Sequence, residues 1–311
     1  MSNNKEQEVN SKTNINWYPG HMAKTRRQIT EDLRLVDIVI ELLDARIPMS
    51  SRNPDIANIT KNKKKIIILN KSDLADEKQN KEWIAEFKKQ KIEAVLTDSN
   101  TGRGIDEAIK TIEKIMEKEL NLYAEKGRIG KKIKAMVLGI PNVGKSSFIN
   151  RISKKASAGV GNKPGVTRQK QWIRVNEKIE LLDTPGVLWP KFESEEVALN
   201  LAFTGTIKDD ILERTEIAYY LVKFLTENYK DKLCERYKLD VDQADKILSN
   251  KDQPENENIY EIFLLIGKKR GCIISGGNID EEKTARIILD EFKNGKIGKI
   301  TLENVKGIIT K

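Results

Sequence analysis

Two short motifs in this sequence stand in an order that few folds can accommodate. Asn70-Lys-Ser-Asp73 matches NKxD, an element that reads a guanine base, and Gly139-Ile-Pro-Asn-Val-Gly-Lys-Ser146 matches a phosphate-binding loop. In a conventional guanine-nucleotide-binding domain the phosphate loop comes first and NKxD comes late. The reversed order predicts a circularly permuted sheet, because a nucleotide pocket depends on where its groups lie in space and not on chain order.

The segments around both motifs predict an open, largely parallel α/β sheet. Residues 66–69 form a continuous apolar run, typical of a strand covered on both faces, and Asn70 follows at its carboxyl end. Residues 133–138 predict a strand that leads into the glycine loop, with a helix expected from near Lys145. Because ligands bind at the carboxyl ends of such strands, both motifs should face one cleft. Further strands are expected over residues 38–43, 92–96 and 179–182, and helices over 22–35, around Trp83 and over 105–120.

The glycine loop carries the groups that hold nucleotide phosphates. Successive backbone N–H groups at the start of a helix form a nest for anions. Lys145 would add a positive charge near the β- and γ-phosphates, and Ser146 would place its hydroxyl on Mg²⁺. The alternative is a chance match, which the flanking strand and helix disfavour. The residues expected to contact phosphate are Asn142, Val143, Gly144, Lys145, Ser146 and Ser147.

The NKxD segment predicts selectivity for guanine over adenine. Asp73 would accept hydrogen bonds from guanine N1–H and N2–H₂, whereas adenine presents a bare N1 acceptor. Asn70 would tie its loop to the phosphate loop, and Lys71 would lay its aliphatic stem along the base plane. For this tetrapeptide alone, a solvated turn after a strand is the alternative. The residues expected around the base are Asn70, Lys71, Ser72 and Asp73, with Asp98 and Ser99 from the loop whose backbone N–H would meet guanine O6.

Two further segments are candidates for nucleotide-dependent switches. Residues 153–171 are rich in Gly, Lys and Ser, a composition typical of a mobile loop, and Thr167 within them is a candidate second hydroxyl ligand of Mg²⁺. Gly186 follows a predicted strand and would offer its N–H to the γ-phosphate. Both segments are expected to order with GTP and relax after hydrolysis. For Thr167, a plain loop threonine is the alternative.

Six segments, taken in order, resemble those of the ribosome biogenesis GTPase A family, the YlqF-type circularly permuted GTPases. The resemblance covers nearly everything after the N-terminal tail, and extends to a closing helix and turn over Asp290–Gly298. The six segments are Trp17-Tyr-Pro-Gly-His21-Met, Asp44-Ala-Arg46-Ile-Pro48, Asn70-Lys-Ser-Asp73, Gly139-Ile-Pro-Asn-Val-Gly-Lys-Ser146, Gly165-Val-Thr167 and Asp183-Thr-Pro-Gly-Val187.

This resemblance implies a GTPase, converting GTP to GDP and phosphate, that acts late in assembly of the large (50S) ribosomal subunit. It implies contacts with rRNA and ribosomal proteins, and slow intrinsic hydrolysis that the particle and K⁺ stimulate. Asn142 would support the K⁺ ion, the alternative being an asparagine that caps its own loop. Val187 stands where a water-orienting glutamine is usual, and valine cannot hydrogen-bond the attacking water. The resemblance assigns that task to His21, the chain's single histidine, while packing near Trp17 or an RNA phosphate contact is the alternative.

The expected fold class is therefore α/β, followed by a smaller all-helical domain. The motif order is G4-G5-G1-G2-G3: the NKxD segment (G4) and the loop with Asp98 and Ser99 (G5) precede the phosphate loop (G1) and the segments with Thr167 (G2) and Gly186 (G3). Strand signals thin out beyond about Lys191, and amphipathic helices are expected over residues 211–224, 244–248, 259–266 and 284–292. The predicted division is a disordered tail over residues 1–13, a circularly permuted GTPase domain over 14–205 and a helical RNA-binding domain over 206–311.

Composition is compatible with a polyanionic partner. The 311 residues carry 56 Lys+Arg against 47 Asp+Glu, a formal charge of +9 that favours phosphate contacts. Two cysteines, Cys234 and Cys272, suggest neither a disulfide framework nor a zinc site. The polar first dozen residues and the lack of a long apolar run predict a cytoplasmic protein without a membrane anchor. A monomer is expected, although no sequence feature fixes the oligomeric state. Candidate phosphate contacts, for which a solvated basic face is the alternative, are Lys24, Arg26, Arg27, Lys268, Lys269, Arg270, Lys293, Lys296 and Lys299.

Two other functions remain open on the sequence alone. One is a scaffold that binds GTP as a structural or sensory ligand without hydrolysing it, which Val187 and the lack of an identifiable arginine finger motivate. The other is a GTPase in another pathway, such as RNA modification or a membrane transporter. The lack of a membrane segment and of a cysteine-based modification site counts against the latter.

Overall fold

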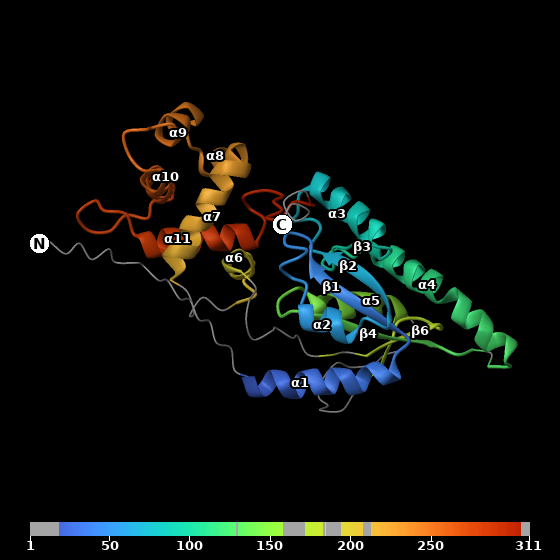
Figure 1. Cartoon of the computed structure of the whole chain (residues 1–311). Helices are drawn as coiled ribbons and strands as arrows, with labels where there is room; N and C mark the ends of the chain where they lie inside the picture. Colours follow the sequence, from blue (N-terminus) through green and yellow to red (C-terminus); the bar gives the residue numbers. More distant parts are fainter. Residues whose placement is uncertain are drawn as a thin grey trace, which may run out of the picture.

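The computed structural model describes residues 19–128, 130–157, 172–182, 184, 194–207 and 213–305. For residues 19–25 and 154–157 it describes the helical backbone alone. The described elements form a sheet covered by helices, with a group of C-terminal helices beside it (Figure 1). The predicted N-terminal tail, residues 1–13, lies outside the described residues.

The described strands make one six-stranded sheet in the order β3-β2-β1-β4-β6-β5. All neighbouring pairs are parallel except β5 and β6, which pair antiparallel at one edge. The carboxyl ends of the parallel strands therefore lie at one edge of the sheet. The strands are β1 (Ile38–Asp44), β2 (Lys64–Asn70), β3 (Glu93–Leu96), β4 (Ile133–Gly139), β5 (Trp172–Arg174) and β6 (Ile179–Leu182).

Burial on both faces accounts for the apolar strands. Every residue of β1 is buried: Val39 and Leu43 pack in clusters on one face, whereas Ile40 packs in the cluster on the other. Fully burying such a side chain contributes about 1.5–3 kcal/mol. The cluster of Val39 includes residues of α1, that of Leu43 residues of α3, and that of Ile40 residues of α4 and α5. These helices are α1 (Pro19–Asp32), α3 (Glu77–Lys89), α4 (Ile105–Glu125) and α5 (Lys145–Ser157), with the short α2 (Pro54–Ile59) between β1 and β2 in the chain.

The C-terminal helices pack around α7, which contacts α6, α8, α10 and α11. Figure 1 shows α7–α11 gathered beside the sheet, next to α6. Their apolar residues belong to the same cluster as the α4 and α5 face of the sheet, so the core is continuous between the two parts. The helices are α6 (Glu195–Phe203), α7 (Arg214–Asn228), α8 (Lys230–Tyr237), α9 (Val241–Leu248), α10 (Glu255–Lys269) and α11 (Glu281–Lys293).

The structure confirms the predicted strands that flank both motifs and corrects several other expectations. It adds β5, α2, α6 and α8, which were not predicted. Helix α5 continues to Ser157, so residues 153–157, which were predicted as part of a loop, are helical, and the rest of that predicted loop lies outside the described residues. Helices α7, α9, α10 and α11 all begin or end beyond their predicted bounds. Among the described residues, no helix is both long and apolar enough to cross a bilayer.

The chain returns to the sheet after α11, through residues 300–305. The Glu303 carboxylate is buried and accepts hydrogen bonds from the backbone N–H of Met49 at 2.6 Å and of Ser50 at 2.8 Å, and also from the Ser50 hydroxyl. The amide of Asn200 in α6 donates to the same carboxylate at 3.4 Å. Trp83 of α3 donates its indole N–H to the Glu303 carbonyl at 3.1 Å. Glu303 thus joins α3, α6 and the loop after β1.

We expect the substitution Glu303→Ala to lower the free energy of unfolding by about 2–4 kcal/mol, because it leaves buried backbone donors without an acceptor. Urea denaturation measures this loss.

Burial raises the pKa of the Glu303 carboxyl, against the lowering effect of its hydrogen bonds to Ser50 and Met49. The native state therefore binds more protons than the unfolded state, so this group makes stability fall as pH rises through its native pKa. Relative to Glu303→Gln, which does not titrate, the wild type should gain stability from about pH 7 to about pH 5; a constant difference would contradict this.

Candidate functional site

The candidate site lies where the ends of β1, β2 and β4 meet. The register pairs Asp44 with Asn70 on the neighbouring strands β1 and β2, and Leu42 of β1 with Gly139 at the end of β4. Strand order runs in one direction from β1 to β3 and in the other from β4, so a switch point falls between β1 and β4. Open α/β sheets bind ligands in the crevice at such a point. The NKxD segment and the glycine loop therefore reach the same crevice, as predicted.

Asn70 ties three loops together from a buried position, 1% exposed. Its side-chain amide donates to the Val143 carbonyl in the glycine loop at 2.9 Å. Its Oδ1 accepts from the Ser99 hydroxyl at 2.7 Å, from the Ser99 N–H at 3.2 Å and from the Thr97 hydroxyl at 3.2 Å. The NKxD loop, the glycine loop and the loop after β3 are thus held by one side chain, so removing it would release all three.

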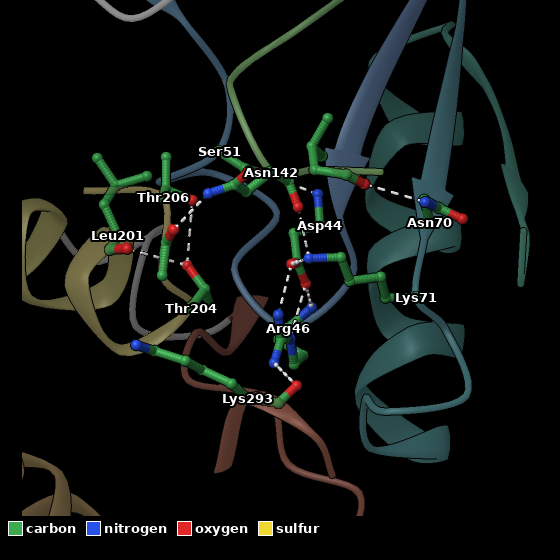
Figure 2. A network of polar contacts seen from close by, with 12 residues as sticks. Asp44, Arg46, Ser51, Asn70, Lys71, Asn142, Leu201, Thr204, Thr206 and Lys293 are labelled. Atoms are coloured by element: carbon green, nitrogen blue, oxygen red, sulfur yellow. Dashed lines mark hydrogen bonds and ion pairs between the residues drawn. The ribbon is translucent and has the colours of Figure 1, made fainter. Parts of the chain in front are cut away.

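Lys71 forms the second link between the NKxD segment and the glycine loop (Figure 2). Its ammonium donates to the Asn142 carbonyl at 2.7 Å and lies 3.0 Å from Oδ2 of Asp44. The backbone of Lys71 has φ 56°, a left-handed conformation unusual outside glycine. This conformation follows directly after β2 and turns the chain over the crevice.

Two glycines allow the glycine loop to pass close to its neighbours. A Cβ at Gly144, which has φ +92°, would collide with the side-chain amide of Asn70. A Cβ at Gly139 would lie 2.8 Å from the Leu42 carbonyl of β1, closer than side chains approach. The close packing of loop on strand therefore requires glycine at both positions.

Helix α5 begins directly after this loop. The N–H of Phe148 donates to the Gly144 carbonyl at 2.9 Å. The N–H groups of the first helical turn precede the i to i−4 bonds of an α-helix and point toward its start. The positive end of the helix dipole adds to these donors, which together favour an anion. Ser146 and Ser147 are exposed at this helix start, whereas Val143 is 1% exposed and packs in the core.

Asp73 keeps an acceptor available at the crevice. Its Oδ1 is buried and finds no hydrogen-bond partner among the described residues. Burial raises the pKa of the Asp73 carboxyl, and the nearby negative charge of Asp98 acts in the same direction while Arg103 and Arg46 oppose it. A ligand that donates a hydrogen bond to this oxygen would stabilise it, since an unpaired buried acceptor costs free energy.

The loop after β3 is held mainly by its own side chains. The Asp98 carboxylate accepts from the Thr101 hydroxyl at 2.5 Å and from the Asn100 N–H at 2.8 Å, so it stabilises its own turn. The Ser99 N–H, like its hydroxyl, is bound to Asn70. Asp98 and Ser99 thus lie in the loop that Asn70 holds, with much of their hydrogen-bonding capacity already used, and their predicted role in binding the base stays a prediction.

Asn142 contacts the C-terminal part of the chain. Its side-chain amide donates to the Gly205 carbonyl, just after α6, at 2.6 Å. Asn142 has φ 60°, a left-handed conformation that asparagine tolerates better than most residues. Gly205 also has positive φ, 74°. The sequence carries no signal for this contact, because the acceptor is a backbone carbonyl.

Three predicted site residues cannot be placed against this geometry. Thr167 and Gly186 lie outside the described residues. His21 lies within α1, but its side chain is not among those described. Near Gly186, Thr184 is buried and donates its hydroxyl to the Val137 carbonyl of β4 at 2.5 Å. Their roles stay predictions.

Asp44 and Arg46 belong to one of the segments that resemble the family, but they were not predicted as site residues. In the structure Asp44 contacts Lys71, and Arg46 contacts Asp44 (Figure 2). A signal for this was present, because Asp44 directly follows a predicted buried strand, and in such sheets ligands bind at the carboxyl ends of the strands.

Comparison with known proteins agrees with this geometry. The family model described as 50S ribosome-binding GTPase matches residues 134–262. The chain is similar to the ribosome biogenesis GTPase A of Bacillus pumilus, at 47% identity over 289 residues that cover 93% of this chain and 98% of that protein. It is also similar to two solved structures of YlqF. The GDP-bound one has 27% identity and a TM-score of 0.63, and covers 90% of this chain and 100% of that one.

The second solved structure is the GNP-bound YlqF from Thermotoga maritima, with 27% identity and a TM-score of 0.60, covering 90% of this chain and 98% of that one. These likenesses establish a P-loop GTPase fold. The match to the Bacillus pumilus protein, at 47% identity, covers nearly the whole length of both chains. The chain therefore belongs to the ribosome biogenesis GTPase A family.

Proposed function

We propose that this protein binds and hydrolyses GTP to drive a late step in assembly of the large (50S) ribosomal subunit. One observation carries the nucleotide part: Asn70 and Lys71 interlock the base-reading segment with the phosphate loop at the sheet's switch point. The ribosomal part is supported by the names of its relatives, ribosome biogenesis GTPase A, and by the family model for 50S ribosome-binding GTPases.

In this proposal the guanine base lies against Lys71 and is read by Asp73. The unpartnered Oδ1 of Asp73 supports this role, because the guanine edge offers donors that a carboxylate accepts in pairs. Ser72 is buried and receives a hydrogen bond from Arg103 at 3.2 Å, which holds the segment in place. Asp98 and Ser99 complete the wall through the loop that Asn70 holds.

The phosphates lie at the start of α5, within reach of the N–H groups from residue 142 to residue 147. Mg²⁺ takes few ligands from the protein in such sites and the rest from phosphates and water. The exposed hydroxyl of Ser146 fits one such place. When bound, Mg²⁺ would neutralise phosphate charge, with Thr167 as its second hydroxyl ligand and Gly186 on the γ-phosphate.

We assign K⁺ to the side-chain oxygen of Asn142. The contact to Gly205 uses the amide nitrogen of Asn142 and leaves its Oδ1 without a donor among the described residues. Water is positioned by His21 in this proposal, because Val187 has no hydrogen-bonding group. Hydrolysis is then slow until the ribosomal particle fixes the segment that carries His21.

We further propose that the sheet is a circularly permuted GTPase domain over residues 14–205, and that residues 206–311 form a helical RNA-binding domain. Strands β1 to β3 carry the base-reading loops and precede β4, which carries the phosphate loop. This order supports the permutation. Exposed Lys268 and Lys269 at the end of α10 are available to RNA phosphates, whereas Arg270 pairs with Glu291.

A basic hollow supports an RNA partner for the sheet as well. It has a volume of about 480 Å³ and lies at the start of β2, the end opposite Asn70. Burial lowers the pKa of Lys65 in its lining, and the positive charge of Arg52 acts in the same direction, while Glu41 opposes it. Such crowding of positive charge favours a phosphate backbone. The charged residues of the lining are Arg52, Lys61, Lys63, Lys64, Lys65, Lys91 and Glu93.

A GTP-binding scaffold that does not hydrolyse its ligand is the second candidate, because Val187 replaces the usual water-orienting side chain. Both candidates share the nucleotide pocket and differ in turnover. A kinetic measurement therefore separates them.

Base selectivity tests the role of Asp73. We expect Asp73→Asn to weaken GDP binding by about 100-fold or more, since it replaces a charged acceptor of two hydrogen bonds. The asparagine amide can donate to the second carbonyl of xanthine, so xanthosine diphosphate should bind better to the variant than GDP does. Fluorescence titration with labelled nucleotides measures both. Asp76→Asn is the control: Asp76 caps α3 in the same loop, so its loss should leave selectivity unchanged.

Turnover tests the enzymatic part of the proposal. We expect purified large ribosomal subunits to raise GTP hydrolysis by about tenfold or more, in KCl more than in NaCl. His21→Ala should abolish this stimulation and keep GTP binding. Phosphate release measures the rate. Turnover that large subunits leave unchanged would favour the scaffold or another pathway.

Charge reversal tests the basic hollow. We expect Lys61→Glu combined with Lys91→Glu to weaken binding to large-subunit rRNA and to reduce the slope of log affinity against log salt by about 1–2. Basal GTP hydrolysis should not change, because the hollow lies at the far end of β2. The matched control is Lys110→Glu with Lys114→Glu, which reverses two exposed lysines of α4 outside the lining. Equal losses in both variants would show a general charge effect only.

A further inference from the structure

Arg46 is a buried arginine beside the nucleotide loops, with 1% of its surface exposed. Its Nε and Nη2 donate to the two carboxylate oxygens of Asp44, at 3.0 Å and 2.8 Å. Its backbone N–H donates to the same carboxylate at 3.0 Å. Such a two-pronged pair fixes both groups in orientation as well as in distance.

The other side of the Arg46 guanidinium faces the end of α11. Its Nη1 donates to the Lys293 carbonyl at 3.3 Å, and its central carbon lies 5.5 Å from the centre of the Phe292 ring. Lys293 is the last residue of α11, so the guanidinium sits at the negative end of the helix dipole. The Arg46 carbonyl also accepts from the Leu302 N–H at 2.8 Å.

Asp44 connects Arg46 to the nucleotide loops through Lys71. Its second cationic partner is Lys71, at 3.0 Å, and Lys71 in turn donates to the Asn142 carbonyl at 2.7 Å. Burial alone would raise the pKa of the Asp44 carboxyl, but the charges of Arg46 and Lys71 and the hydrogen bonds from Arg46 hold that pKa well below its usual range. Asp44 is therefore ionised, and its charge fixes both cations.

We propose that Arg46 is a positioning residue that makes guanine-nucleotide affinity depend on the docking of α11. The inference rests on the proposed function, since it requires Lys71 to hold the nucleotide. When the end of α11 lies on Arg46, the guanidinium is fixed, Asp44 is held in one orientation and Lys71 stays over the crevice. When α11 moves away, Arg46 loses the Lys293 carbonyl and the Phe292 ring, and Lys71 loses its fixed counter-ion.

The coupling works in both directions, because two sites that share a binding equilibrium affect each other equally. A bound nucleotide that fixes Lys71 would strengthen the docking of α11. An RNA partner that displaces the C-terminal helices would speed nucleotide release. The bond from Asn142 to Gly205 runs parallel to this route and ends on the segment after α6 instead.

The test compares three single substitutions by the dissociation constant and release rate of fluorescently labelled GDP. Arg46→Lys keeps the charge but cannot bind both Asp44 oxygens and the Lys293 carbonyl at once. Phe292→Leu keeps an apolar side chain and removes the ring beneath the guanidinium. The matched control is Arg236→Lys. Arg236 lies in α8, pairs at 2.7 Å with Glu291 of α11, the helix that carries Phe292, and does not touch Asp44.

We expect Arg46→Lys to weaken GDP binding about tenfold, mainly through faster release, and Phe292→Leu to weaken it about threefold. Arg236→Lys should change it less than about twofold, even if it lowers the melting temperature as much. A control that weakens GDP binding as strongly as Arg46→Lys would overturn the proposal. Should Arg46→Lys fail to fold, the comparison of Phe292→Leu with Arg236→Lys decides in the same way.

A double-mutant cycle separates positioning from general destabilisation. If Arg46 acts through Lys71, Arg46→Lys should change GDP affinity less than about twofold in a Lys71→Met background. Hydrogen exchange gives the reciprocal readout: GDP should slow exchange at residues 292–302 in the wild type, and less so in Arg46→Lys. Additive effects, or exchange that GDP leaves unchanged, would contradict the positioning role of Arg46 alone. A wild type that binds no GDP would contradict the proposed function itself.

Discussion

A single carboxylate, that of Asp44, holds the nucleotide crevice in register with the rest of the chain. A buried ionised group is stable only when its partners surround it, and here two cations and the Ser51 hydroxyl, which binds the Asp44 N–H at 3.0 Å, surround this residue. One cation comes from the NKxD segment and the other contacts α11. Leaving either cation out would strand a charge in the interior. The arrangement therefore specifies one relative placement of base loop and C-terminal helix.

The chain order that we propose as a permutation explains why such joints are needed. Strands β1 to β3 and strands β4 to β6 meet only along the β1–β4 pair, and α4 alone links them in the chain. The NKxD segment and the glycine loop therefore lie on separate halves, and the Asn70 amide joins them through its hydrogen bond to the Val143 carbonyl at 2.9 Å. The C-terminal helices follow the half with β4 to β6 in the chain. Residues 300–305 nevertheless return to the half with β1 to β3, where Glu303 holds the loop after β1. The two halves are thus joined on two sides.

Sequence patterns predicted those parts of the fold that carry a periodic or chemical signature. Strands β2 and β4 were predictable because they are apolar runs that end in motifs, and the crevice followed from the rule for strand ends. Strand β5 has three residues, too few to show alternation, and its place at the sheet edge depends on pairing with β6. Helix α2 is six residues long, and its signal was the Asn53 cap before Pro54, which reads equally well as a turn. The contact of Asn142 with Gly205 was unpredictable, because every residue has a carbonyl and only the folded chain selects which one is near.

The same asparagine is the point where these constraints meet. The Asn142 carbonyl accepts from Lys71, and its amide donates to Gly205, so one residue contacts both the NKxD segment and the segment after α6. Its left-handed backbone turns these two groups toward their different partners. A K⁺ ion on the side-chain oxygen would have to share that side chain with Gly205. Under the proposed assignment of K⁺ to Asn142, K⁺, the nucleotide and the segment after α6 are coupled, because a change that rotates Asn142 for one of them alters its contacts with the other two.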